Sequence, residues 1–186
     1  MQLVLFSQRR RLLVIAAAAA LVAPAAAVAA DRTALERDAS AAFQKLIANV
    51  PAARALSKDA VGVLVFPKIT KAGFVVGGQY GDGVLFKNGK AAGYYNTTGA
   101  SYGLQAGAQQ YGYAMFLMTQ KALNALNESN GFEVGAGPSI VVVDQAMSES
   151  IALAKVENDI YAFVFGRQGL MGGMGLTGNK ISRLKD

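Results

Sequence analysis

The chain has 186 residues, enough for a single domain with a modest core, and 53% of them are apolar, which excludes a disordered chain. It contains no histidine and no cysteine. The commonest general base, the commonest metal ligand and the thiolate ligands of zinc are therefore missing, and neither a disulfide nor a lipid-modified cysteine can form. We expect no metal, no cofactor and no catalytic activity.

Residues 1–30 have the pattern of a secretory signal. Arg9–Arg11 precede an apolar stretch that Pro24 interrupts, and small residues that suit signal peptidase continue to Ala30. We expect cleavage after Ala30 and export to the periplasm or cell envelope. The alternative is an uncleaved anchor helix, since residues 12–30 carry no charge.

The formal net charge of +6 overstates the charge of the exported protein. Cleavage would remove three basic and no acidic residues, and would leave fifteen basic residues against twelve acidic ones, a net charge of +3. This mild positive charge favours an anionic membrane surface but is too weak to predict binding of nucleic acid.

The chain after Ala30 begins with a predicted helix. Thr33–Glu36 matches a capping box, and the apolar positions that follow recur at helical spacing as far as Val50. Pro51 ends this helix and suits the first turn of a second, short helix that continues through Leu56.

A glycine-rich region with strand composition follows, and all 21 glycines lie between Gly62 and Gly178. Short strands are predicted at Val61–Phe66 and Phe74–Tyr80. The segment from Val84 to Asn96 is predicted to be a hairpin, because Asn88 and Gly89 both tolerate the positive φ angles of a type I′ turn.

The stretch Ser101–Thr119 alternates with period two and is predicted to be extended, with a bend or turn near Gly112. Thr119 can cap a helix that ends near Asn130-Gly131. Phe132–Val143 then has the composition of another strand.

The last elements are less regular. Asp144–Glu157 fits either a helix or an extension of the sheet. Ile160–Phe165 and Leu170–Thr177 predict a final pair of strands around Gln168-Gly169. Together the elements predict one α+β domain over residues 31–186. We expect a mostly antiparallel, strongly curved or barrel-like glycine-rich sheet, with the N-terminal and intervening helices packed on it.

Two short motifs imitate catalytic sequences. Gly99–Gly103 matches the G-x-S-x-G of esterases, but no histidine exists to activate the serine, so a glycine-spaced strand is the better interpretation. Ser182–Lys185 matches S-x-x-K but ends one residue before the last. Gly77–Gly83 and Gly173–Lys180 are glycine-rich without the spacing of a phosphate-binding loop before a helix.

A family resemblance rests on three ordered motifs. The first is Phe66–Phe74 (FPKITKAGF) followed by Gly77–Leu85 (GGQYGDGVL), the second is Gly135–Pro138, and the third is Tyr161–Gly175. In this order they resemble the SYLF domain, and the resemblance covers the chain from about Asp31 onward. It implies a lipid-binding module. Met171 stands where the family often has an aromatic residue.

The resemblance also implies partners. Eukaryotic SYLF proteins bind phosphoinositides, some bind actin beside a Src-homology-3 domain, and bacterial members are exported. With an export signal and no second domain, actin is not an expected partner. We predict an anionic phospholipid or membrane surface, and as the alternative an envelope structural or protein-interaction module. An enzyme using carboxylates such as Asp82 and Glu133 is the third and least favoured hypothesis.

Candidate lipid-binding residues combine cations with apolar neighbours, as a phospholipid surface requires. Lys68 and Lys71 are predicted to lie in a loop between two strands, with Phe66 and Phe74 on either side. An ordinary solvated loop is the alternative interpretation for each lysine. The other candidates are the upstream cations and a predicted turn that could enter a membrane: Arg54, Lys58, Arg167, Leu170 and Met171.

Overall fold

The computed structural model describes residues 31–128, 131–143, 157–169 and 178–184. The chain divides into two compact units, residues 1–34 and residues 35–186, and the fold described here is that of the second. The predicted signal and its cleavage site lie outside the described residues, as do Asp144–Val156 and Leu170–Thr177. Within the part of the chain that is described, no helix is both long and apolar enough to cross a membrane.

Two helices come first, as predicted. Residues 31–49 are helical, and α2 (Pro51–Asp59) follows, with Val50 extended at its N-cap and Pro51 in its first turn. The predicted capping box at Thr33 is wrong, because residues 31 and 32 are already helical. A capping residue needs non-helical backbone angles, and Thr33 lies inside the helix.

One sheet forms the rest of the fold. Its strands are β1 (Gly62–Lys87), β2 (Lys90–Leu117), β3 (Phe132–Glu133), β4 (Ile140–Val143), β5 (Ile160–Gly169) and β6 (Lys180–Arg183). The order is β3-β6-β2-β5-β4, with β1 also paired to β2, and every pair is antiparallel except β4 with β5. The predicted α+β class and mostly antiparallel sheet are confirmed.

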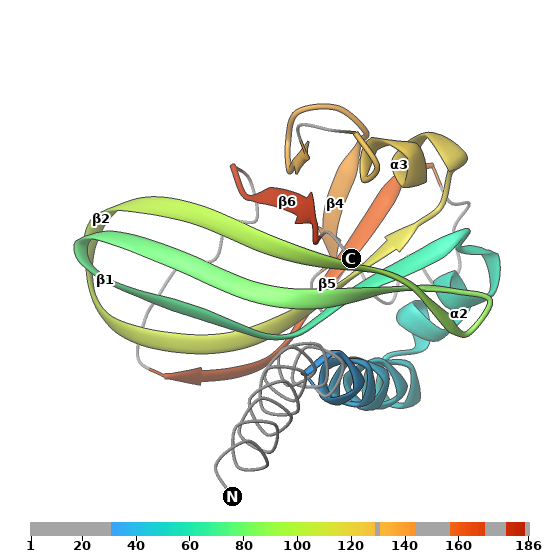
Figure 1. The fold of residues 1–186 in the computed structure, drawn as a ribbon, viewed down its shortest axis with the longest axis horizontal. Coiled ribbons are helices and arrows are strands. Elements are labelled where there is room, and N and C mark those ends of the chain that lie inside the picture. The colour runs from blue at the N-terminus through green and yellow to red at the C-terminus, as the bar shows by residue number, and fades with distance from the viewer. Residues whose placement is uncertain (1–30, 129–130, 144–156, 170–177, 185–186) are drawn as a thin grey trace, which may run out of the picture. The chain divides into compact units, whose positions relative to one another are not determined.

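The β1–β2 hairpin is the main element of this sheet. Its turn has φ angles of 50° at Asn88 and 75° at Gly89, which confirms the predicted type of turn. The paired strands then double back on themselves, so that each has two arms and the sheet curls into a half-barrel (Figure 1). The bend lies between Gly73 and Gly77, where a Cβ on Gly73 would stand 2.3 Å from the Cα of Gly77.

The two arms of β1 approach so closely that side chains are excluded between them. A Cβ on Gly81 would lie 2.7 Å from the carbonyl oxygen of Lys68, and one on Gly83 would lie 2.6 Å from the ring of Phe66. Glycine within a strand weakens it, and its use here is explained by this close approach.

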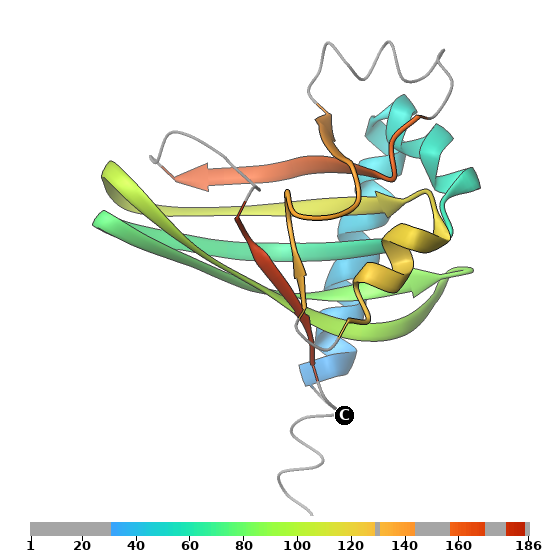
Figure 2. The ribbon, with the colours of Figure 1, turned by 90° about the horizontal axis from the view of Figure 1, so that it is seen from above.

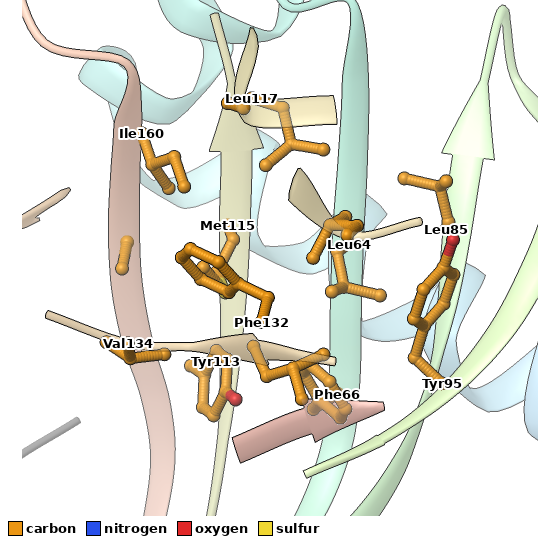
Figure 3. Packing of buried hydrophobic residues seen from close by; sticks show 14 of the residues in the cluster. Leu64, Phe66, Leu85, Tyr95, Tyr113, Met115, Leu117, Phe132, Val134 and Ile160 are labelled. Carbon is orange, nitrogen blue, oxygen red and sulfur yellow. The ribbon is translucent and has the colours of Figure 1, made fainter. Parts of the chain in front are cut away.

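The concave side of the curled sheet holds one apolar core. Leu64 and Phe66 of the first β1 arm meet Leu85 of the second arm, and Tyr113 and Met115 of β2 pack beside them (Figure 3). The rings of Phe66 and Tyr113 are 4.7 Å apart. The helix α3 (Gln120–Ala125) and strands β3 and β6 contribute further residues to the same core.

The convex side holds a second core beneath the first two helices. Ala39 and Leu46 of the first helix and Leu56 of α2 are buried there against Val65, Phe116 and other residues of the sheet. Residues 35–49 run across the strands (Figure 2). The phenol of Tyr94 donates a hydrogen bond to the Glu36 carboxylate and ties this helix to β2. The sheet is therefore apolar on both faces over its central part.

Several predicted breaks between strands are not present. The loop expected between Phe66 and Phe74 is continuous β1, interrupted only by a bulge at Pro67-Lys68 opposite Gly112. β2 does not turn at Gly112, where the ladder with β5 merely shifts register. A bulge bends a strand without ending it. Pro67 and Gly112 therefore mark bulges in continuous strands and not the predicted loop and turn.

Two other predictions about strands need correction. Phe132–Val143 is not one strand, because Gly135 and Gly137 have φ angles of 99° and 124° and separate β3 from β4. Gln168-Gly169 is not a turn, since both residues pair with β2 at the end of β5. The predicted strand Leu170–Thr177 lies outside the described residues, and β5 and β6 are not adjacent in the sheet.

A carboxylate at the start of β5 connects three elements. Asp159 accepts hydrogen bonds from the Thr119 hydroxyl at 2.8 Å and from the Ser139 backbone N–H at 3.0 Å, and it lies 3.5 Å from the Lys121 ammonium. Thr119 is also the N-cap of α3, as predicted, through a bond from the Ala122 N–H. The Thr119 hydroxyl first, and then the Ser139 N–H, hold the pKa of Asp159 below its ordinary value.

We expect Asp159→Asn to lower the melting temperature at neutral pH, because an amide cannot accept all these bonds. A carboxyl with a lowered pKa stabilises the fold above its unfolded-state pKa of about 3.9 and loses that contribution as pH falls through the folded value. The variant and the parent should therefore converge in melting temperature in acid. A constant difference from neutral pH to pH 3 would contradict this role.

The close approach of the β1 arms makes a second prediction. Gly81→Ala should lower the free energy of unfolding by about 1–3 kcal/mol, because its Cβ would overlap backbone atoms of the facing arm. Gly78→Ala is the matched control in the same strand, since its Cβ would find only the Gly99 carbonyl oxygen, at 3.9 Å. Urea unfolding of both variants measures the difference, and equal stabilities would contradict the packing described.

Candidate functional site

The predicted lipid-binding residues are separated by the fold. Lys58, Lys68 and Arg167 are exposed, in α2, in the β1 bulge and in a β5 bulge respectively. The β5 bulge places Gly166 and Arg167 opposite Tyr111 of β2. Leu170 and Met171 lie outside the described residues, and of Phe74 only the backbone, in β1, is described.

The Arg54 side chain has a structural role, because its guanidinium is hydrogen-bonded to the backbone of the first helix. Its Nε donates to the carbonyl oxygen of Ile47 at 2.9 Å and its Nη2 donates to that of Ala48 at 2.7 Å. These carbonyls belong to the last turn of the first helix, where the C=O groups have no intrahelical N–H partner. The negative end of the helix dipole also favours a cation there. The guanidinium therefore caps that helix while its residue remains exposed.

Phe66 cannot contact a membrane. Its side chain is fully buried in the concave core against Tyr113, so the prediction that it flanks a lipid-binding loop is wrong. The error follows from the missing loop, because a residue in a continuous strand alternates between faces and Phe66 falls on the buried one.

Lys71 is the predicted site residue whose environment is most unusual. It is only 6% exposed, on β1 opposite Gln109 of β2. It follows Ile69 at the spacing that places both on the concave face, and Ile69 is part of the concave core. No carboxylate of a described residue forms an ion pair with it. A lysine with so little exposed surface and no ion-pair partner is rare in folded proteins.

Other polar groups gather on the same face near the bend. The Tyr111 hydroxyl donates to Oε1 of Gln79 at 2.9 Å and joins the two arms of the ribbon. Gln79 faces Gly99, and the Oδ1 of Asn179 would stand 2.4 Å from a Cβ on that glycine. Asn179 is 4% exposed and Gln109 is 5% exposed. We call Lys71, Gln79, Gln109, Tyr111 and Asn179 the inner polar cluster.

Three atoms of the inner polar cluster are buried and have no hydrogen-bond partner among the described residues. They are Nε2 of Gln79, Oε1 of Gln109 and Nδ2 of Asn179. Each buried polar atom left unpaired costs about 1–3 kcal/mol. Two of the three are donors and one is an acceptor, and Gln109, which carries the acceptor, is the cross-strand partner of Lys71. This arrangement can bind an anion that also carries a donor.

The tyrosines of the concave face remain neutral. Burial raises the pKa of Tyr111 and, more strongly, that of Tyr113, whose hydroxyl donates to Thr97 at 3.1 Å. On the convex side a hydrogen bond to Asp82, at 2.6 Å, raises the pKa of Tyr80 to about 12. No phenolate therefore compensates Lys71 at physiological pH.

A separate groove of about 200 Å³ lies beside Lys58. Phe43 of the first helix and Phe86 of β1 line its apolar side, and their rings stack 6.5 Å apart. Ser40, Gln44 and Ser57 add hydroxyl and amide groups. Lys58, one of the two predicted upstream cations, thus lines a groove with both apolar and polar walls.

The two segments that resemble catalytic or phosphate-binding motifs, Gly99–Gly103 and Gly77–Gly83, are strands, as interpreted from the sequence. Gly99–Gly103 lies within β2, which continues as strand to Leu117, and Gly77–Gly83 lies within β1. Among the described residues no three histidine, cysteine, aspartate or glutamate side chains gather to hold a metal ion. Neither segment has the strand–turn–helix geometry of the enzymes it imitates.

Sequence reasoning found Lys71 but missed its companions. Gln79, Gln109 and Asn179 are neutral amides in strands or at a strand end, and nothing in their spacing separates them from surface residues. In β2 the odd positions from Tyr111 to Leu117 face the concave core. Gln109 continues this row toward the bend as a polar residue.

Comparison with known protein families gives one match. The sequence model of the family described as "Ysc84: Las17-binding protein actin regulator" matches residues 98–186. Residues 98–186 therefore match the Ysc84 (SYLF) family, as the resemblance implied. The match contains the second and third of the motifs on which the resemblance rested, whereas the first motif, in β1, lies before it. No curated protein matches the chain.

The SYLF assignment supports the broad functional prediction. SYLF domains are binding domains for lipids or actin-related partners and are not a known enzyme family. A binding module is consistent with the inner polar cluster, which has donors, an acceptor and a cation but no histidine or cysteine.

The role of Arg54 can be separated from lipid binding. Arg54→Met should lower the free energy of unfolding by about 1 kcal/mol, because it removes both bonds to the end of the first helix. Lys58→Met is the control in the same helix and should leave stability unchanged, since no hydrogen bond of the Lys58 side chain is seen in the described structure. Chemical denaturation measures both, and equal values would contradict the capping role.

Proposed function

We propose that this protein is a non-enzymatic lipid-binding module of the bacterial cell envelope that recognises anionic phospholipid. The observation that carries the proposal is Lys71, a lysine that is only 6% exposed and has no carboxylate partner in the described part of the chain. An anionic ligand would supply a counter-charge to Lys71, and a charge-assisted hydrogen bond is stronger than a neutral one.

The bend of the ribbon offers an apolar contact close to Lys71. Val76 lies in the bend, between Gly73 and Gly77, and is 61% exposed, more than any other large hydrophobic residue described. A lipid ligand needs both a cation for the phosphate and apolar surface for the interface. Val76 and Lys71 provide these two features within six residues of one strand.

The exposed cations support attraction to an anionic surface. Lys68 and Arg167 occupy bulges on the two strands that flank β2 near Tyr111 and Gly112. Export supports the envelope location, and it rests on the composition of residues 1–30 alone. A lipid ligand of the exported protein would be met at a membrane face outside the cytoplasm.

Binding to vesicles tests the proposal. The protein should float with vesicles of phosphatidylcholine plus phosphatidylglycerol and not with phosphatidylcholine alone. Lys71→Met keeps the length of the side chain and removes its charge, and should weaken binding about tenfold or more. Lys71→Glu is a poorer test, because a carboxylate on a residue only 6% exposed would lower the stability of the fold as well as the affinity.

Salt distinguishes the buried cation from the exposed one. Lys68→Gln should weaken binding only at low ionic strength, because exposed charges are screened at about 10 Å in 0.1 M salt, whereas the effect of Lys71→Met should persist. Equal flotation with neutral and anionic vesicles would contradict anionic lipid recognition. Unchanged affinity in folded Lys71→Met would contradict the assigned site.

The apolar contact has its own test. Val76→Glu should reduce binding to anionic vesicles, since it places a carboxylate where the lipid interface would lie. Val142→Glu is the control, because Val142 is also exposed, at 46%, but lies in β4. Equal losses in the two variants would argue for nonspecific charge repulsion and against contact through the bend.

A further inference from the structure

We propose that the inner polar cluster binds the headgroup of a single ligand: a phosphodiester whose alcohol carries a free hydroxyl, as a glycerol headgroup does. This inference rests on the proposed function and names the chemistry of its site. The phosphate would accept hydrogen bonds from Lys71 and the free amide donors, and the hydroxyl would donate to Gln109.

The donors are placed to converge on one anion. Gly99 has no side chain, and a Cβ there would meet Oδ1 of Asn179 at 2.4 Å and Nε2 of Gln79 at 3.0 Å. The glycine therefore leaves room for two amides from β1 and from the residue before β6. Nε2 of Gln79 and Nδ2 of Asn179 remain buried and unpaired, as donors to phosphate oxygens would be before binding.

Lys71 lies on the other arm of the same fold. It stands two residues before Gly73, and Gln79 stands two residues after Gly77, so the bend brings the two toward one another from opposite arms. The Tyr111–Gln79 hydrogen bond fixes the distance between the arms. An anion between the arms would meet one cation and two neutral donors, which suits a singly charged phosphodiester.

The acceptor determines which headgroup fits. Oε1 of Gln109 is buried and unpaired, and Gln109 is the cross-strand partner of Lys71. A ligand group beside it has to donate a hydrogen bond and should not be cationic, because like charges directly opposed across a ladder repel. A hydroxyl meets both conditions. A choline headgroup cannot donate, and an ammonium headgroup would lie against the lysine.

The unpaired polar atoms of the inner polar cluster provide a test that a structural role would not satisfy. Gln109→Met keeps the volume and removes the unpaired oxygen, so it should raise the melting temperature, by about 2 °C or more, while it weakens ligand binding. Gln110→Met is the control, because Gln110 precedes Tyr111 on the opposite face of β2 and has no unpaired buried atom among those described.

The binding experiment uses vesicles and water-soluble probes with the purified protein. Glycerophosphoglycerol should compete with phosphatidylglycerol vesicles at least tenfold better than inorganic phosphate or glycerophosphocholine. Gln109→Met should abolish this preference and Gln110→Met should keep it. Direct calorimetric titration with glycerophosphoglycerol distinguishes a free soluble ligand from a lipid headgroup as the source of the phosphodiester.

The possible results distinguish the proposed lipid binding from the proposed headgroup site in the inner polar cluster. If glycerophosphoglycerol does not compete with vesicle binding, and Gln109→Met binds vesicles as well as the parent protein, this inference is overturned. Lipid binding would then take place at another surface. Binding of the soluble probe without vesicle binding supports the site and overturns the lipid proposal. Equal competition by phosphate and by glycerophosphoglycerol overturns the role of the hydroxyl. No binding of either overturns both proposals.

Discussion

The fold depends on one steric constraint, the return of the β1–β2 ribbon upon itself. The arms can meet only because Gly73, Gly81 and Gly83 present no Cβ to backbone and ring atoms less than 3 Å away. This contact closes the concave core around Phe66 and Tyr113. It also brings Lys71 and Gln79, which are distant on an extended strand, to the same enclosed face. Backbone geometry thus creates the polar site as well as the core.

The concave face changes character along its length. Near the hairpin turn and α3 it is filled by Leu64, Leu85 and Met115, and near the bend it carries amides, phenols and an ammonium. Apolar packing at one end stabilises the curvature that holds unpaired polar atoms at the other. Natural proteins tolerate locally unfavourable free energies at binding sites, because ligand binding offsets them. The rest of the fold has to be stable enough to remain folded without the ligand.

The sequence predicted the helices, the hairpin turn, the class of fold and the cap at Thr119, because each depends on contacts within a few residues. It failed where a distant segment decided the outcome. Pro67 and Gly112 signal a break locally, but pairing across β2 absorbs them as bulges. Lys71 was found for its charge and misplaced in a loop. Gln109 and Asn179 were missed, since only the folded ribbon shows that their amides lack partners.

The central position of β2 has a consequence for how the domain can be divided. The family match begins at residue 98, in the middle of β2, whereas 23 residue pairs join β2 to β1 along nearly its whole length. A fragment that starts at the match would expose that hydrogen-bonding edge and lose Leu64 and Phe66 from the core. Such an edge invites aggregation. The start of the family match therefore does not coincide with a boundary of the folded domain, because it falls within the pairing of β1 with β2.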